Sequence, residues 1–199
     1  MVKILSVKAL SKEFGGLRAL NNICFDVEPC EIVGVIGPNG AGKTTLFNSL
    51  VGLCRCKDGS IRLSGKEIRG AKPHSIARAG MTKTFQNVAL FPDMTVVENV
   101  LTGGLAHHPL KVARKSAEQA LHRVGISAIA DKLVTDLTFS EKALVEVARA
   151  LCTSPRVLLL DEVMAALTDV EMCAVLDLIR SLRDEGLTVI VVEHHMRAI

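Results

Sequence analysis

Gly37-Pro38-Asn39-Gly40-Ala41-Gly42-Lys43-Thr44-Thr45 is the stretch that decides the fold of this 199-residue chain. It fits the pattern G-x-x-x-x-G-K-[ST] and lies between an expected strand, Ile32–Ile36, and the apolar start of an expected helix. Glycines let such a loop curl until successive N–H groups point at phosphate oxygens, and the helix start adds the positive end of its dipole. We expect Lys43 to reach the outer phosphates and the Thr44 hydroxyl to ligate Mg²⁺. The stretch therefore predicts a nucleotide-binding loop.

The composition indicates one well-buried core, with room for a subdomain, because 49% of the residues are hydrophobic. The net charge of +3 is too small to indicate nucleic-acid binding, and the absence of Trp and Tyr leaves few platforms for stacking bases. No apolar run approaches about 18 residues, and the N-terminus lacks the apolar core of a signal peptide. The six cysteines form no C-x-x-C pair and are typical of reduced residues in a cytosolic protein.

One charged segment stays open to two interpretations. Residues 55–83 carry Arg55, Lys57, Arg62, Lys66, Arg69, Lys72, Arg78 and Lys83 against only Asp58 and Glu67. The segment is either a solvated face or a patch that faces phosphates or an anionic partner.

Hydrophobic periodicity predicts an α/β fold in which a helical segment interrupts a nucleotide-binding core. The expected strands are Val2–Leu10, Ile23–Val27, Ile32–Ile36, Ser60–Gly65, Met81–Phe85, Val157–Leu160 and Leu187–Val192. The expected helices are Lys43–Gly52, Glu98–Leu105, Val112–Val124, Ser140–Leu151 and Asp169–Asp184, with one or two helical turns at Pro73–Ala79. Ile32–Ile36 and Leu187–Val192 have the apolar content of buried strands. Within Ser140–Leu151, Glu141, Lys142, Glu146 and Arg149 fall on a polar face.

Several polar residues follow the expected strands, where ligands bind in α/β folds. Asp161 can hold a Mg²⁺ shell, and the adjacent Glu162 can polarise a water for attack on the γ-phosphate. Gln86 can ligate the metal or orient that water, and His194 can donate a hydrogen bond to the γ-phosphate. For each residue alone, an acidic turn, a structural glutamine or an incidental histidine is the alternative.

Taken in this order, these features resemble the ATP-binding subunit of an ABC transporter. Gly37–Thr45 is similar to the Walker A loop, Gln86 to the Q-loop glutamine, Leu137-Thr138-Phe139-Ser140-Glu141 to the signature loop, Val157–Asp161 to Walker B, Glu162 to the catalytic glutamate, Ala165-Ala166-Leu167-Thr168 to the D-loop, His194 to the switch histidine and Phe14 to the aromatic that stacks on adenine. Phe14-Gly15-Gly16-Leu17 and the stretch from Leu90 to Asn99 are most similar to the importer ATPases for branched-chain amino acids.

The resemblance implies one ABC ATP-binding domain over residues 1–199, with a P-loop NTPase core, a small antiparallel β region and an inserted helical subdomain. Residues 1–86 and 152–199 would form the core and residues 87–151 the helical subdomain. It implies ATP and Mg²⁺ as cofactors, a second ABC subunit paired head to tail, and transmembrane permease subunits as partners, but no nucleic acid. The location would be peripheral, at the cytoplasmic face of the inner membrane. Relatives continue past the switch histidine, so we expect part of the core to be missing and apolar sheet surface near Leu187–Val192 to be uncovered.

Departures from the family pattern leave alternative functions open. Ser140 and Glu141 replace a glycine and a glutamine of the usual signature, Val163 replaces a proline, and Thr168 an aspartate. Ser140 is a candidate helix N-cap, and Glu141 adds negative charge near a triphosphate. We therefore weigh an importer ATPase against a nucleotide-binding subunit with little hydrolysis, and against a soluble ABC-type ATPase of DNA repair or translation.

Overall fold

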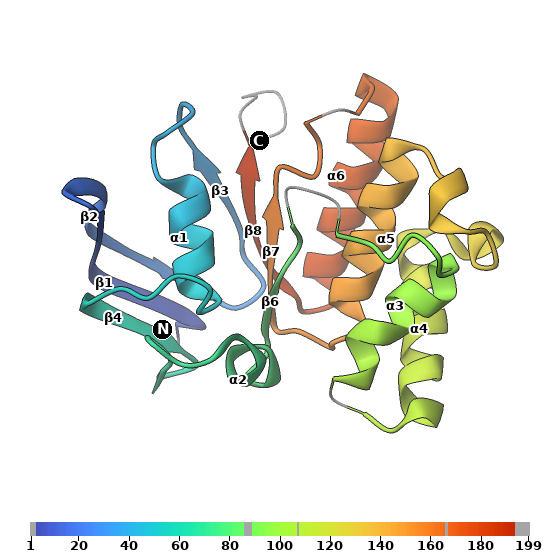
Figure 1. Cartoon of the computed structure of the whole chain (residues 1–199), viewed down its shortest axis with the longest axis horizontal. Coiled ribbons are helices and arrows are strands. Elements are labelled where there is room, and N and C mark those ends of the chain that lie inside the picture. Colours follow the sequence, from blue (N-terminus) through green and yellow to red (C-terminus); the bar gives the residue numbers. More distant parts are fainter. Residues whose placement is uncertain (1–2, 86–88, 107, 166, 194–199) are drawn as a thin grey trace.

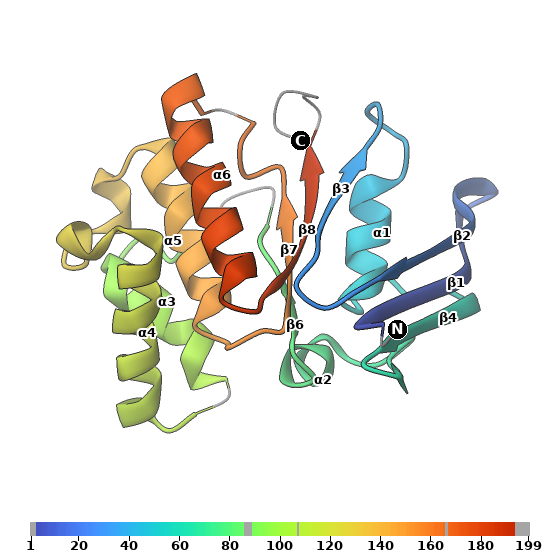
Figure 2. The same cartoon turned by 180° about the vertical axis from the view of Figure 1, so that it is seen from behind.

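The computed structural model describes residues 3–85, 89–106, 108–165 and 167–193. Its strands form two four-stranded sheets, one antiparallel and one parallel. Figures 1 and 2 show helix α1 (Lys43–Leu50) between the two sheets, and four longer helices on the far side of the parallel sheet. The predicted α/β class with a small antiparallel region is confirmed.

The antiparallel sheet has the strand order β2-β1-β4-β5. Its members are β1 (Leu5–Phe14), β2 (Leu17–Val27), β4 (Asp58–Leu63) and β5 (Lys66–Glu67). β1 and β2 pair up to Phe14 and Leu17, because Gly15 and Gly16 turn the chain with φ of 51° and 91°. The predicted bounds Val2–Leu10 and Ile23–Val27 leave out this hairpin end, because its exposed residues show no apolar alternation.

The parallel sheet has the order β3-β8-β7-β6, formed by β3 (Ile32–Ile36), β6 (Met81–Lys83), β7 (Val157–Asp161) and β8 (Thr188–Glu193). The two central strands, β7 and β8, are buried at every residue. β3 pairs only with β8 among the described strands, and Ile36 at its end is 51% exposed. The expectation that Ile32–Ile36 is buried was therefore wrong, because apolar content does not distinguish an edge strand from a central one. Apolar sheet surface is exposed at β3, which lies beside β8, whereas β8 itself is buried.

The parallel sheet separates two hydrophobic cores. On one face, Phe47 and Leu50 of α1 pack with Leu159, Ile190 and the antiparallel sheet. On the other face, Leu158 and Val189 pack with residues of the four helices. Those helices are α3 (Val96–Leu105), α4 (Leu110–Val124), α5 (Phe139–Leu151) and α6 (Asp169–Asp184), and the short α2 (Pro73–Arg78) contacts β6. None of the helices in the described ranges combines the length and apolarity required to cross a bilayer.

Three of these helices begin with the same device, a threonine N-cap followed by a glutamate at the third helical position. The pairs are Thr95 with Glu98 in α3, Thr138 with Glu141 in α5, and Thr168 with Glu171 in α6. In each pair the hydroxyl accepts from the glutamate N–H and the carboxylate accepts from the threonine N–H, forming a capping box. The backbone hydrogen bond is the main reason that the pKa of each of these capping glutamates lies below its ordinary value.

Candidate nucleotide-binding site

The predicted phosphate loop joins β3 to α1 at the edge of the parallel sheet where its strands end. Gly42 is the N-cap of α1, with a left-handed φ of 90°, and it has no side chain with which to cap the helix. A Cβ atom on Gly42 would lie 2.4 Å from the backbone oxygen of Ala19 in β2. Glycine is therefore required at this position, and the uncapped N–H groups of the first turn suit an anion.

Lys43 is 7% exposed and lies under the loop that it follows. Its Nζ donates to the carbonyl oxygens of Gly37 at 2.7 Å and Pro38 at 3.0 Å. The ammonium group thus braces the loop from inside, close to the place where phosphates are expected. Thr44 is exposed at the helix start.

An open groove of about 470 Å³ brings the loop together with two residues predicted from distant parts of the chain. It is lined by residues 39–45 and by Phe14, Leu17, Arg18, Ala19 and Glu162. Phe14 lies at the hairpin end, half exposed, with the Lys12 ammonium 4.6 Å from its ring centre. The groove therefore has an aromatic ring at one end, a phosphate loop, and a carboxylate beside that loop.

Asp161 ends β7 and is 1% exposed, next to the loop helix. The Lys83 ammonium lies 3.3 Å from its Oδ2 atom and donates to Asn48 of α1 at 2.9 Å. Burial raises the pKa of the Asp161 carboxyl above its usual range, and the charge of Lys83 opposes this rise without cancelling it. This ion pair was not predicted, although Lys83 lies in the expected strand Met81–Phe85 that precedes Gln86.

The second carboxylate oxygen of Asp161, Oδ1, is buried and has no hydrogen-bond partner among the described residues. A buried acceptor without a donor is costly, and a cation would satisfy it. Thr44 supplies a hydroxyl at the adjacent helix start. The donor set of a carboxylate and a hydroxyl, both oxygen ligands, fits Mg²⁺.

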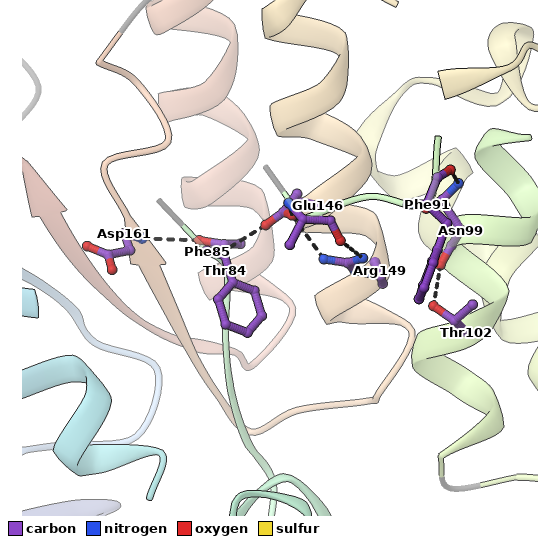
Figure 3. Close-up of polar contacts among 9 residues, drawn as sticks. Thr84, Phe85, Phe91, Asn99, Thr102, Glu146, Arg149 and Asp161 are labelled. Atoms are coloured by element: carbon purple, nitrogen blue, oxygen red, sulfur yellow. Dashed lines mark hydrogen bonds and ion pairs between the residues drawn. The ribbon is translucent and has the colours of Figure 1, made fainter. Parts of the chain in front are cut away.

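The backbone around Asp161 and Glu162 is held on both sides. The N–H of Asp161 donates to the Thr84 hydroxyl at 3.1 Å (Figure 3), and the N–H of Glu162 donates to Val192 of β8 at 3.0 Å. Glu162 adopts a left-handed φ of 54°, which is uncommon for a residue with a side chain. Backbone strain of this kind clusters at functional sites, where surrounding contacts hold it in place.

The predicted signature loop, Leu137–Glu141, forms the start of α5. Leu137 is buried, Thr138 is the N-cap and Phe139 is 51% exposed. The expected helix start at Ser140 and its role as N-cap were therefore wrong, because the T-x-x-E pattern places the cap two residues earlier. The Ser140 hydroxyl lies 3.0 Å from that of Thr138. Glu141 is engaged by its own capping box, which the T-x-x-E spacing in the sequence indicates.

Two predicted site residues, Gln86 and His194, lie outside the described residues. The structure does place Phe85 and Glu193, their neighbours in sequence, at the same sheet edge as Asp161. Glu193 is buried at the end of β8, and its carboxylate accepts from the N–H of Met164 at 3.1 Å.

Comparisons with known proteins agree with this geometry. The family model of the ABC transporter matches residues 20–165. BraF of Pseudomonas aeruginosa, a high-affinity branched-chain amino acid transport ATP-binding protein, is 40% identical over 98% of this chain and 84% of its own length. LivG of Escherichia coli, with the same description, is 37% identical over the same shares.

Two solved structures of ABC transporter cassettes have a similar fold. The ADP conformation of MJ1267, an ATP-binding cassette of an ABC transporter, matches with a TM-score of 0.91 at 27% identity, over 100% of this chain and 84% of that one. A structure of an ATP-binding cassette titled as nucleotide-free also matches with a TM-score of 0.91, at 26% identity over 98% of this chain and 83% of that one. The resemblance inferred from the sequence is confirmed, and the chain belongs to the ABC transporter family.

Proposed function

We propose that this chain binds and hydrolyses ATP to power an importer whose solute is a branched-chain amino acid. The observation that carries the proposal is the single groove in which the phosphate loop faces Glu162 beside the buried Asp161. The solute class rests on the names of BraF and LivG, which are branched-chain amino acid transport proteins. Because these relatives serve transport, an ATPase of DNA repair or translation is not favoured.

Different residues of the groove would bind different parts of ATP. Phe14 stacks on adenine, the N–H groups of residues 39–45 hold the phosphates, and Lys43 exchanges its loop carbonyls for phosphate oxygens. Thr44 and Asp161, with Gln86, would hold Mg²⁺, which when bound neutralises charge on the β- and γ-phosphates.

Hydrolysis requires a group that activates water beyond the γ-phosphate. Glu162 lines the groove and is held by a strained backbone, so it takes the role of general base. His194 assists as a donor to the γ-phosphate. In this assignment Glu162 holds the proton of the attacking water while the phosphate loop retains the product.

The partners follow from the family. The signature loop at the start of α5 would face the ATP of a second ABC subunit, which places its helix N-terminus against the γ-phosphate. Phe85, Phe91 and Met94 are exposed apolar side chains between β6 and α3, and they offer a contact for a permease. We further propose that the chain lies peripherally at the cytoplasmic face of the inner membrane, with residues 87–151 as its helical subdomain.

Glu162→Gln tests the proposal, because the amide keeps the shape of the side chain but removes the charge that activates water. We expect the ATPase rate to fall about 100-fold or more while ATP affinity is retained. Glu118→Gln, on the exposed side of α4, is the matched control and should leave the rate unchanged. A wild-type chain that binds no ATP in calorimetry, or an unchanged rate in Glu162→Gln, would contradict the assignment.

A further inference from the structure

Helix α5 carries a buried carboxylate that the proposed chemistry does not use. The side chain of Glu146, in the middle of the helix, is 2% exposed. Its Oε2 atom accepts from the N–H of Phe85 at 2.9 Å, and its Oε1 atom accepts from the N–H of Ala89 at 2.7 Å (Figure 3). One carboxylate thus binds the chain that leaves β6 and the chain that leads toward α3.

The charge of Glu146 is compensated where it lies. Arg149, one turn further along α5, donates from Nη2 to Oε1 at 2.9 Å and from Nη1 to the carbonyl of Ala89 at 2.7 Å. A buried carboxylate is tolerated only when it is paired and hydrogen-bonded, and these donors meet that requirement. Removing one acceptor oxygen would therefore leave a backbone N–H without a partner.

The contact continues into the proposed magnesium site. Thr84, the residue before Phe85, donates its N–H to Leu159 of β7 at 2.9 Å and accepts from the N–H of Asp161 through its hydroxyl at 3.1 Å. Thr84 and Asp161 are each 1% exposed. A continuous chain of hydrogen bonds therefore runs from Glu146, in the middle of α5, through the Thr84–Phe85 peptide unit and the Thr84 hydroxyl to Asp161.

We propose that Glu146 is a positioning residue that ties helix α5, and with it the signature loop, to the metal-binding carboxylate of Asp161. The proposal rests on the proposed function, since a role in hydrolysis requires Asp161 to ligate the metal. Because α5 begins at Thr138, any displacement of the signature loop along this helix is transmitted to β7 through Glu146 and Thr84.

A second buried polar side chain provides a matched contrast. Asn99 of α3 is 0% exposed and accepts from the N–H of Phe91 at 2.7 Å (Figure 3). Its amide also donates to the carbonyls of Phe91, Met94 and Thr95. These contacts stay within the turn that precedes α3 and do not reach Thr84. Asn99→Ala should therefore destabilise the fold without affecting Asp161.

The experiment compares Glu146→Gln with Asn99→Ala in the full chain, with Mn²⁺ affinity of the ATP complex read by electron paramagnetic resonance. Partners that orient metal ligands typically contribute about 10- to 100-fold to affinity or activity. We expect Glu146→Gln to weaken Mn²⁺ binding and to lower kcat by about tenfold, with KM for ATP within about twofold of wild type. In Asn99→Ala only the melting temperature should fall.

Two further measurements keep the result decisive. Thr84→Val removes the hydroxyl at the other end of this chain of hydrogen bonds and should weaken Mn²⁺ binding in the same way, which keeps the test open if Glu146→Gln does not fold. Thr84→Ser keeps the hydroxyl and should bind Mn²⁺ like the wild type. Hydrogen exchange of the Asp161 amide without nucleotide should quicken in Glu146→Gln, and this readout holds even if ATP binding fails. Unchanged exchange at Asp161, or equal losses of Mn²⁺ affinity in Glu146→Gln and Asn99→Ala, would overturn the proposal.

Discussion

Replacement of Lys43 tests the phosphate loop most directly, and the structure sets the size of the effect. The ammonium donates to two loop carbonyls, Gly37 and Pro38, and these bonds must be exchanged for bonds to phosphate when ATP binds. Hydrogen bonds that involve a charged group contribute about 1.5–3 kcal/mol each. Because bonds are exchanged rather than newly made, we assign a net loss of about 2 kcal/mol to Lys43→Ala, which is about 30-fold in Kd.

Lys43→Gln separates the positive charge of Lys43 from its hydrogen bonds to the loop carbonyls. The amide is long enough to donate toward the same carbonyls, so it preserves part of the loop support while removing the positive charge. We expect calorimetry with Mg·ATP to show nearly the same loss of affinity in Lys43→Gln as in Lys43→Ala, and thermal unfolding to show a smaller drop in melting temperature for Lys43→Gln. An affinity within about threefold of wild type in both variants, less than 1 kcal/mol, would refute the assignment of Lys43 to the phosphates.

Three other changes probe the loops and helix starts. Gly42→Ala should abolish measurable ATP binding, since its Cβ would lie 2.4 Å from a backbone oxygen, whereas Gly40→Ala meets only open space and should weaken binding less; calorimetry compares them. Ser140→Gly combined with Glu141→Gln should raise the ATPase rate severalfold at unchanged affinity, because Gln still completes a capping box without the charge; a flat rate would show that this loop does not limit turnover. The capping glutamates have lowered pKa values in the fold, so the stability they contribute is present above their unfolded pKa near 4.5 and is lost as pH falls through their folded pKa values; urea unfolding should show a smaller acid loss when all three are replaced by Gln.

Local patterns predicted the phosphate loop, the helix Asp169–Asp184 and the acidic residues at the end of the strand Val157–Asp161. Each of these features depends on residues within one turn or one strand. The loop requires its glycines for reasons of backbone geometry, and β7 ends at Asp161 where its apolar run ends. The hairpin end at Phe14 and the exposure of β3 were not predictable in this way. Both depend on which strand lies beside which, and neighbours in a sheet are not encoded in one strand's composition.

The polar face of α5 shows why amphipathic patterns find cores more easily than polar contacts. Periodicity places Glu146 and Arg149 with Glu141 on a polar face, but it does not say what that face contacts. In the structure that side meets the backbone around Phe85 and Ala89, which lies outside helices and strands and cannot satisfy its own N–H groups. An irregular segment packed against a helix needs acceptors from elsewhere, and a carboxylate on that helix supplies two oxygens at once. A Glu and Arg one turn apart on a helix that covers such a segment is therefore a signal of internal anchoring rather than of a solvated surface.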